Sequence, residues 1–136
     1  MNASRWEQRA KSFDRAYLLL AEAVDADEDS LSELEKEGVI QRFEYTFELA
    51  WKTLNDYLLH QGLQPEPVTP RAVIKQAFSA GIIEDGQGWI DMLEHRNLMS
   101  HAYDRGRFLE AFQAIRTRYC GYLGQLSQWF KKHREM

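Results

Sequence analysis

Apolar residues recur every three or four positions through most of the 136-residue chain, which is the period of an α-helix with one buried face. The clearest stripe falls within an arc of about 80° on a helical wheel, and its members are Ile40, Phe43, Phe47, Trp51, Leu54 and Leu58. Neither a hairpin signal nor an internal repeat interrupts this pattern. The sequence therefore predicts an all-α fold, an up-and-down bundle of four or five helices.

Local signals predict where these helices begin and end. The predicted helices span about residues 4–24, 31–59, 70–80, 89–100 and, after a break at residues 104–106, about 108–130. Ser30 is expected to cap the second helix because Glu33 follows it by three residues, as in a capping box. Gly38 is expected to loosen that helix. Thr69 and Pro70 predict the start of the third helix, because threonine is a common N-cap and proline a common first helical residue.

The composition, 44% hydrophobic and 28% charged, is typical of one globular domain, here residues 1–136. The single cysteine, Cys120, excludes an internal disulfide and a cysteine-rich metal site. The first residues lack a signal-peptide pattern, and no apolar run approaches the roughly 18 residues of a membrane span. These features predict a cytoplasmic protein away from membranes. The many aromatic residues of the second and last helices exceed what so small a domain covers alone, which predicts at least a dimer.

The charge is unevenly distributed along the chain. Residues 1–90 contain 9 Lys and Arg against 16 Asp and Glu, whereas residues 91–136 contain 8 against 5. The overall net charge of −4 argues against indiscriminate coating of nucleic acid. A locally basic segment on an acidic chain favours a specific contact with a polyanion instead.

The most reactive set of side chains lies within this basic segment. Residues 96–103 read RNLMSHAY. They combine an arginine, whose guanidinium group can bind two phosphate oxygens, with a histidine that exchanges protons near neutral pH. Asn97 and His101 share a helix face, so Asn97 is placed to orient the histidine ring. Arg96 and His101 are about 140° apart on a straight helix. They converge only if the helix ends near His101 or if two copies meet across a two-fold axis.

The same spacing is also typical of an exposed helix end, where the positive charges of Arg and His complement the C-terminal end of the helix dipole. Spacing alone slightly favours this structural interpretation over a catalytic site. Glu44, at the edge of the apolar stripe, needs a partner if it is buried, and Arg96 is the predicted one. The alternative is that Glu44 belongs to an ordinary pattern of surface charges spaced four residues apart on the helix. For Glu48 and Lys52, which form one such pair, this is the better interpretation. The spacing of His95 and His101 matches no common ligand pattern, so no metal or cofactor is expected.

Residues 96–103 match the R-x4-H-x-Y motif of HEPN domains, and residues 41–52, which read QRFEYTFELAWK, resemble the signature of one HEPN branch. That branch is the nucleotidyltransferase substrate-binding protein family, and the resemblance extends over nearly the whole chain. It implies a helical bundle that forms homodimers and a gene beside that of a minimal nucleotidyltransferase, often as a toxin–antitoxin pair.

In active HEPN toxins the motif arginine and histidine form a metal-independent ribonuclease site at the dimer cleft. The resemblance thus implies catalysis by Arg96 and His101 on RNA, and Asn97 also matches the motif. Glu44 would support this site as the predicted partner of Arg96. In some pairs the nucleotidyltransferase antitoxin silences the toxin by adding AMP to the motif tyrosine, which by position is Tyr103. Other family members act only as non-catalytic partner subunits of the nucleotidyltransferase, and this alternative stays open.

Overall fold

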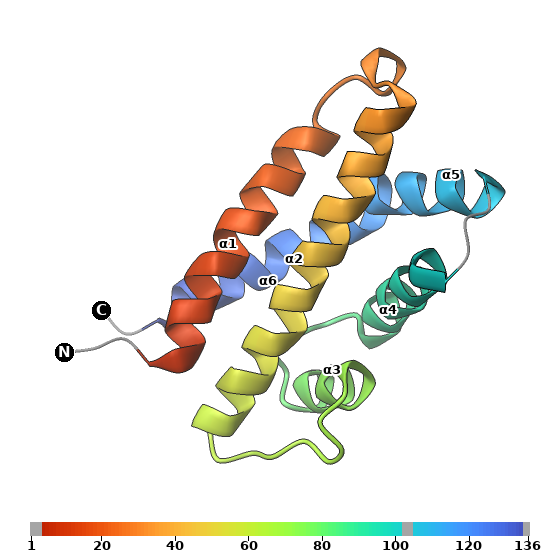
Figure 1. Cartoon of the computed structure of the whole chain (residues 1–136). Helices are drawn as coiled ribbons and strands as arrows, with labels where there is room; N and C mark the ends of the chain where they lie inside the picture. Colours follow the sequence, from red (N-terminus) through yellow and green to blue (C-terminus); the bar gives the residue numbers. More distant parts are fainter. Residues whose placement is uncertain (1–3, 102–104, 135–136) are drawn as a thin grey trace.

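The computed structural model describes residues 4–101 and 105–134, and at positions 100 and 101 the backbone alone (Figure 1). All regular elements of these residues are helical, which confirms the predicted all-α class. In chain order they are α1 (Arg5–Val24), the 3₁₀ turn η1 (Glu28–Ser30), α2 (Glu33–His60), α3 (Pro70–Ser79), α4 (Gly86–His101), α5 (Arg105–Ala114), the π-helical turn η2 (Ile115–Tyr119) and α6 (Cys120–His133). No described helix is both long and apolar enough to cross a membrane.

Helix α2 begins two residues later than predicted. Its N-cap is Ser32, which accepts a hydrogen bond from the Glu35 backbone N–H at 3.1 Å, and Glu35 returns the capping-box contact at 2.9 Å. The hydroxyl of Ser30 instead donates to the carbonyl of Asp27 at 2.6 Å and so closes the 3₁₀ turn. The prediction failed because the sequence offers two Ser-x-x-Glu pairs two residues apart. The expected loosening at Gly38 is absent, since α2 is continuous from end to end.

The predicted cap of α3 is confirmed, because Thr69 accepts the Ala72 N–H at 3.2 Å and Pro70 is the first helical residue. Helix α4 begins three residues earlier than expected, at Gly86. The carboxylate of Asp85 accepts the Gly88 N–H at 2.9 Å, which satisfies a donor of the first turn. The glycines here predict a break, and this side-chain cap is what overrides them.

The predicted last helix is divided into α5, η2 and α6. It also starts earlier, since Arg105 and Gly106, expected to break the pattern, form the first turn of α5. Two hydrogen bonds from Arg105 to Glu33, at 2.6 and 2.7 Å, tie that turn to the start of α2. The remaining residue of the expected break, Asp104, lies outside the described residues.

Helices α1 and α2 lie side by side with opposite chain directions, and α6 passes behind them (Figure 1). Their shared core is aromatic: the ring centroids of Phe13 and Phe130 are 6.0 Å apart, and those of Phe43 and Tyr119 are 5.7 Å apart. These four side chains are fully buried within one chain. Three of the aromatic residues behind the dimer prediction are thus covered within one chain, whereas Trp51, Tyr122 and Trp129 are only partly buried, and the dimer stays a prediction.

Candidate functional site

Arg96 lies in the last turns of α4 and connects that helix to α2. Its Nη2 donates to Glu48 Oε2 at 2.5 Å, and its Nη1 donates to Asn97 Oδ1 at 3.3 Å. Lys52 also approaches Glu48, at 3.5 Å. The Arg96 side chain is 28% exposed and that of Glu48 is 31% exposed. The guanidinium is therefore fixed in position and still reachable from solvent.

Glu44 was the predicted partner of Arg96, and that prediction is wrong. The ion pair with Arg96 is made instead by Glu48, one helical turn later on α2. Glu44 is half-buried beside the pair. Burial raises the pKa of the Glu44 carboxyl, and the positive charge of Arg96 partly offsets this by lowering it. Helical spacing places both glutamates on the side of α2 that faces α4, and only the three-dimensional register distinguishes them.

His101 is the last described residue of α4, and residues 102–104 that follow it lie outside the described part of the chain. The side chain of His101 and the whole of Tyr103 lie outside the described residues. Their predicted roles therefore stay predictions, as does the orientation of His101 by Asn97. What the structure shows for Asn97 is a contact with Arg96 itself.

The structure reveals a second polar cluster that the sequence did not indicate. His95 Nδ1 hydrogen-bonds the hydroxyl of Tyr119, and His95 Nε2 lies 3.3 Å from Glu110 Oε1. The Glu110 carboxylate can only accept, so the proton of its contact with His95 is carried by Nε2 of the ring. Burial raises the pKa of Tyr119 to about 12, so its phenol stays protonated and can donate to Nδ1. Sequence reasoning missed the cluster because Tyr119 belongs to an apolar stripe.

A cavity of about 370 Å³ opens beside this cluster, between α4 and α5. It is lined by His95, Leu98, Met99, Arg107 and Glu110. Two hydrophobic side chains, one carboxylate, one guanidinium and one imidazole thus surround a single hollow. Consecutive residues of an α-helix are about 100° apart, so His95 and Arg96 direct their side chains from different faces of α4, one to the cavity and the other to α2.

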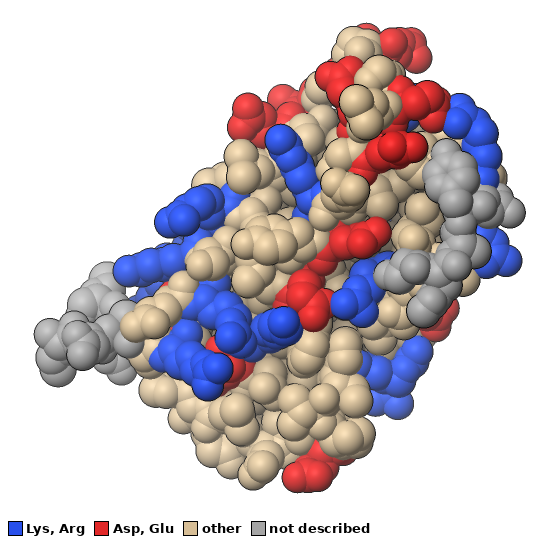
Figure 2. Space-filling model, viewed as in Figure 1, with Lys and Arg blue, Asp and Glu red and all other residues tan. Residues whose placement is uncertain are grey.

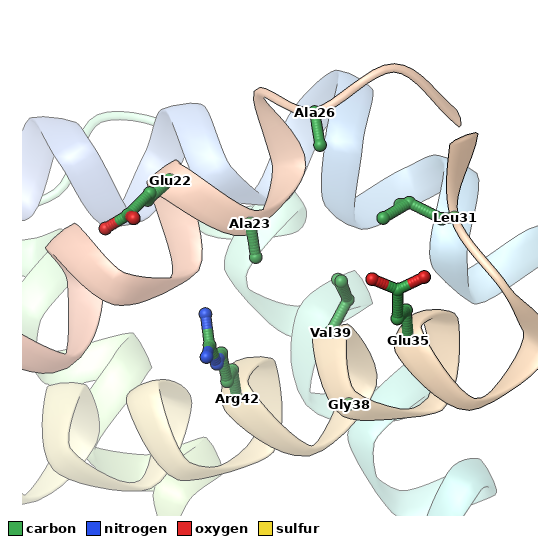
Figure 3. Close-up of a pocket in the computed structure, with 8 residues that line it drawn as sticks. All are labelled: Glu22, Ala23, Ala26, Leu31, Glu35, Gly38, Val39 and Arg42. Carbon is green, nitrogen blue, oxygen red and sulfur yellow. The ribbon is translucent and has the colours of Figure 1, made fainter. Parts of the chain in front are cut away.

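Another hollow, of about 330 Å³, lies between the end of α1 and the start of α2 (Figure 3). Two of its polar groups already serve local structure: Arg42 donates to the Leu19 carbonyl at 3.0 Å, and Glu35 caps α2. Acidic side chains gather over this end of the molecule, whereas basic ones gather toward the start of α1 (Figure 2). In the described ranges, no group of three or more His, Cys, Asp or Glu side chains is arranged to hold a metal ion.

The sequence matches one protein family and one curated relative. Residues 8–132 match the family described as "Nucleotidyltransferase substrate binding protein like". Over 81 residues the chain is 26% identical to a Haemophilus influenzae protein named "Probable ribonuclease HepT", and the match covers 57% of this chain and 56% of that protein. The chain thus spans little more than half the length of this curated relative.

Two solved structures share the fold. A crystal structure of a protein from Thermus thermophilus superposes with a TM-score of 0.78 at 29% identity, over 88% of this chain and 98% of the other. A Haemophilus influenzae structure, described as revealing the fold of a substrate binding domain of a nucleotidyltransferase, gives a TM-score of 0.74 at 19% identity, over 90% and 98%. These likenesses agree with the predicted HEPN-like bundle.

Proposed function

Because the chain belongs to the nucleotidyltransferase substrate binding protein like family, we propose that it is a metal-independent endoribonuclease of the HEPN toxin type, neutralised by a minimal nucleotidyltransferase. The single observation that carries the proposal is the state of Arg96, fixed by Glu48 and still 28% exposed. A guanidinium held in place before substrate arrives is what stabilisation of a phosphate transition state requires. The name of the Haemophilus influenzae relative supports the same activity.

In the proposed reaction the ribose 2′-oxygen attacks the adjacent phosphorus, and the bond from phosphorus to the 5′-oxygen breaks. A base removes the 2′-hydroxyl proton and an acid protonates the departing 5′-oxygen, which leaves a 2′,3′-cyclic phosphate and a 5′-hydroxyl. His101 supplies the proton transfer, a contribution of about 10²–10⁴ in rate. Arg96 binds the charge that develops on the phosphorane oxygens.

A homodimer is part of this proposal, because one histidine cannot be base and acid in the same instant. A two-fold axis near the end of α4 brings a second His101 to the cleft, so that one copy accepts a proton while the other donates one. A particle of monomer mass in light scattering at micromolar concentration contradicts the two-histidine scheme. A particle of twice the monomer mass supports it.

Tyr103 is the proposed site of silencing by the partner. Its phenol oxygen attacks the α-phosphorus of ATP in the nucleotidyltransferase, pyrophosphate leaves, and the phenol loses its proton. The attached phosphate then competes with RNA for Arg96. Intact-mass spectrometry after co-expression is expected to show added AMP, and Tyr103→Phe is expected to remain active and unmodified. Full inhibition of an unmodified chain indicates steric docking instead.

The second candidate is a non-catalytic subunit that presents substrate to a nucleotidyltransferase, and the family description and the second Haemophilus structure favour it. Incubation of purified protein with RNA in excess chelator separates the two. Under the main proposal wild type cleaves, while His101→Ala and Arg96→Ala do not. Equal cleavage by all three proteins points to contamination. No cleavage by wild type, together with tight co-purification of a nucleotidyltransferase, establishes the second candidate.

A further inference from the structure

The cavity between α4 and α5 has apolar walls and a polar edge that the proposed reaction does not use. We propose that this cavity is a nucleobase subsite that prefers a base with an exocyclic amine. The inference rests on the proposed function, since it assumes that single-stranded RNA lies across the end of α4. It adds to that function a specific contact outside the cleavage chemistry.

The walls suit the flat face of a base. Leu98 is 41% exposed although it lines a hollow, and Met99 beside it packs on the core. The thioether of methionine and the branched chain of leucine are suited to packing against an unstacked base. The volume of about 370 Å³ lies within the range of roughly 300–1,000 Å³ that is usual for small-molecule sites.

The polar edge carries an acceptor and a donor side by side. Glu110 Oε1 is the acceptor, and the Nε2 proton of His95, 3.3 Å away, is the donor. The buried Tyr119 hydroxyl holds the other ring nitrogen, so the imidazole cannot turn away. Glu110 itself is exposed and can move slightly to admit a partner.

Cytosine and adenine present the complementary pair, an amine N–H beside a ring nitrogen that accepts a hydrogen bond. Uracil places a carbonyl oxygen where cytosine has its amine, and this oxygen faces the Glu110 carboxylate unfavourably. Cytosine and uracil have almost the same shape, so a preference between them measures the hydrogen bonding alone. Arg107 also lines the cavity, and its positive charge is suited to attract the phosphate of a neighbouring nucleotide.

The test is binding of fluorescent oligo(C) and oligo(U) strands whose 2′-hydroxyls are replaced by fluorine, so that neither is cleaved by 2′-oxygen attack. Wild type is expected to bind oligo(C) about tenfold more tightly than oligo(U), the effect of one good polar contact to a base edge. Glu110→Gln is expected to bring the ratio close to one, because the amide both donates and accepts. Glu66→Gln, an exposed glutamate in the loop before α3, removes the same charge and is expected to keep the wild-type ratio.

Each outcome decides one of the two proposals or both. A wild-type protein that binds or cleaves RNA without preferring oligo(C), or a Glu110→Gln variant that keeps the preference, overturns the subsite and leaves the ribonuclease intact. A preference for oligo(C) that Glu110→Gln removes, in a protein that cleaves no natural RNA, supports the subsite and overturns the ribonuclease. Absence of any RNA binding overturns both.

Discussion

Two arginine–carboxylate pairs join neighbouring helices in this protein, and they differ in one respect. Arg9 of α1 lies 2.9 Å from Asp56 of α2, and Arg96 of α4 lies 2.5 Å from Glu48 of α2. The two arginines are equally exposed, at 29% and 28%, but the Asp56 side chain is 6% exposed whereas that of Glu48 is 31% exposed. The burial of the carboxylate, and not the contact distance, distinguishes a structural pair from one available to a ligand.

The physical reason lies in what each carboxylate loses without its arginine. Asp56 has little access to water, and its Oδ2 makes no well-directed hydrogen bond within the described residues, so it depends on the nearby positive charge. A buried charge left alone is strongly unfavourable. Glu48 keeps both water and Lys52 as alternatives. Loss of the Arg96 contact therefore leaves a solvated Glu48 and costs little stability.

The largest expected effect is on activity. Arg96→Ala is expected to lower the rate of RNA cleavage by at least about 10²-fold, the usual loss when one donor to a transition-state oxyanion is removed. The free energy of unfolding is expected to change by no more than about 1 kcal/mol, because the pair is half-exposed. Single-turnover cleavage and urea denaturation measure the two quantities. If Arg96→Ala lost as much stability as a variant that breaks the buried pair of Arg9 and Asp56, the contrast between the two pairs would be wrong.

The next largest effect is expected at the buried pair of Arg9 and Asp56, where stability changes and the cleavage rate does not. Arg9→Ala is expected to lower the free energy of unfolding by about 2 kcal/mol, below the usual range for a broken buried pair because Arg5 lies 4.0 Å from the same carboxylate. Cleavage per folded molecule is expected to stay at the wild-type rate. Arg15→Ala, on the exposed face of α1, is the matched control and is expected to leave both quantities unchanged. An Arg9→Ala protein of wild-type stability contradicts the argument from burial.

A smaller effect is expected when the carboxylate of the exposed pair is neutralised. Glu48→Gln keeps the shape and one acceptor but loses the charge, so Arg96 is held less firmly. Cleavage is expected to fall about fivefold, since a charge-assisted hydrogen bond is roughly twice as strong as a neutral one. Glu66→Gln serves again as the control for a lost surface charge. A Glu48→Gln variant as inactive as Arg96→Ala means that Glu48 has a larger role than positioning.

The smallest effect concerns the pKa of Glu44. Because Arg96 lowers this pKa, Arg96→Ala is expected to raise it further above its ordinary value, whereas Arg9→Ala leaves it unchanged. A raised folded-state pKa means that the folded protein holds the proton more tightly than the unfolded chain. Stability therefore falls as pH rises from the unfolded value, about 4.3, through the folded one, and it falls more in Arg96→Ala. Carbon-detected NMR titration of Glu44 measures the shift, and an unchanged pKa in Arg96→Ala excludes the coupling.

Sequence patterns identified the parts of this molecule whose signals are local. The stripe on α2, the Thr69 cap and the position of Arg96 near the end of a helix all follow from spacing of a few residues. The choice between Glu44 and Glu48 did not, because both lie on one side of α2 and only the packing of α4 decides between them. The contact between His95 and Tyr119 joins residues 24 positions apart and has no local signature.

The measurement that tests the central claim most directly uses a DNA strand with one ribonucleotide, incubated with the purified wild-type protein in excess chelator. The account predicts cleavage after that single ribose, a 2′,3′-cyclic phosphate on the product, and loss of both in Arg96→Ala and His101→Ala but not in Arg9→Ala. Cleavage of the matched all-DNA strand, or cleavage that appears only when a divalent metal is added, would contradict it.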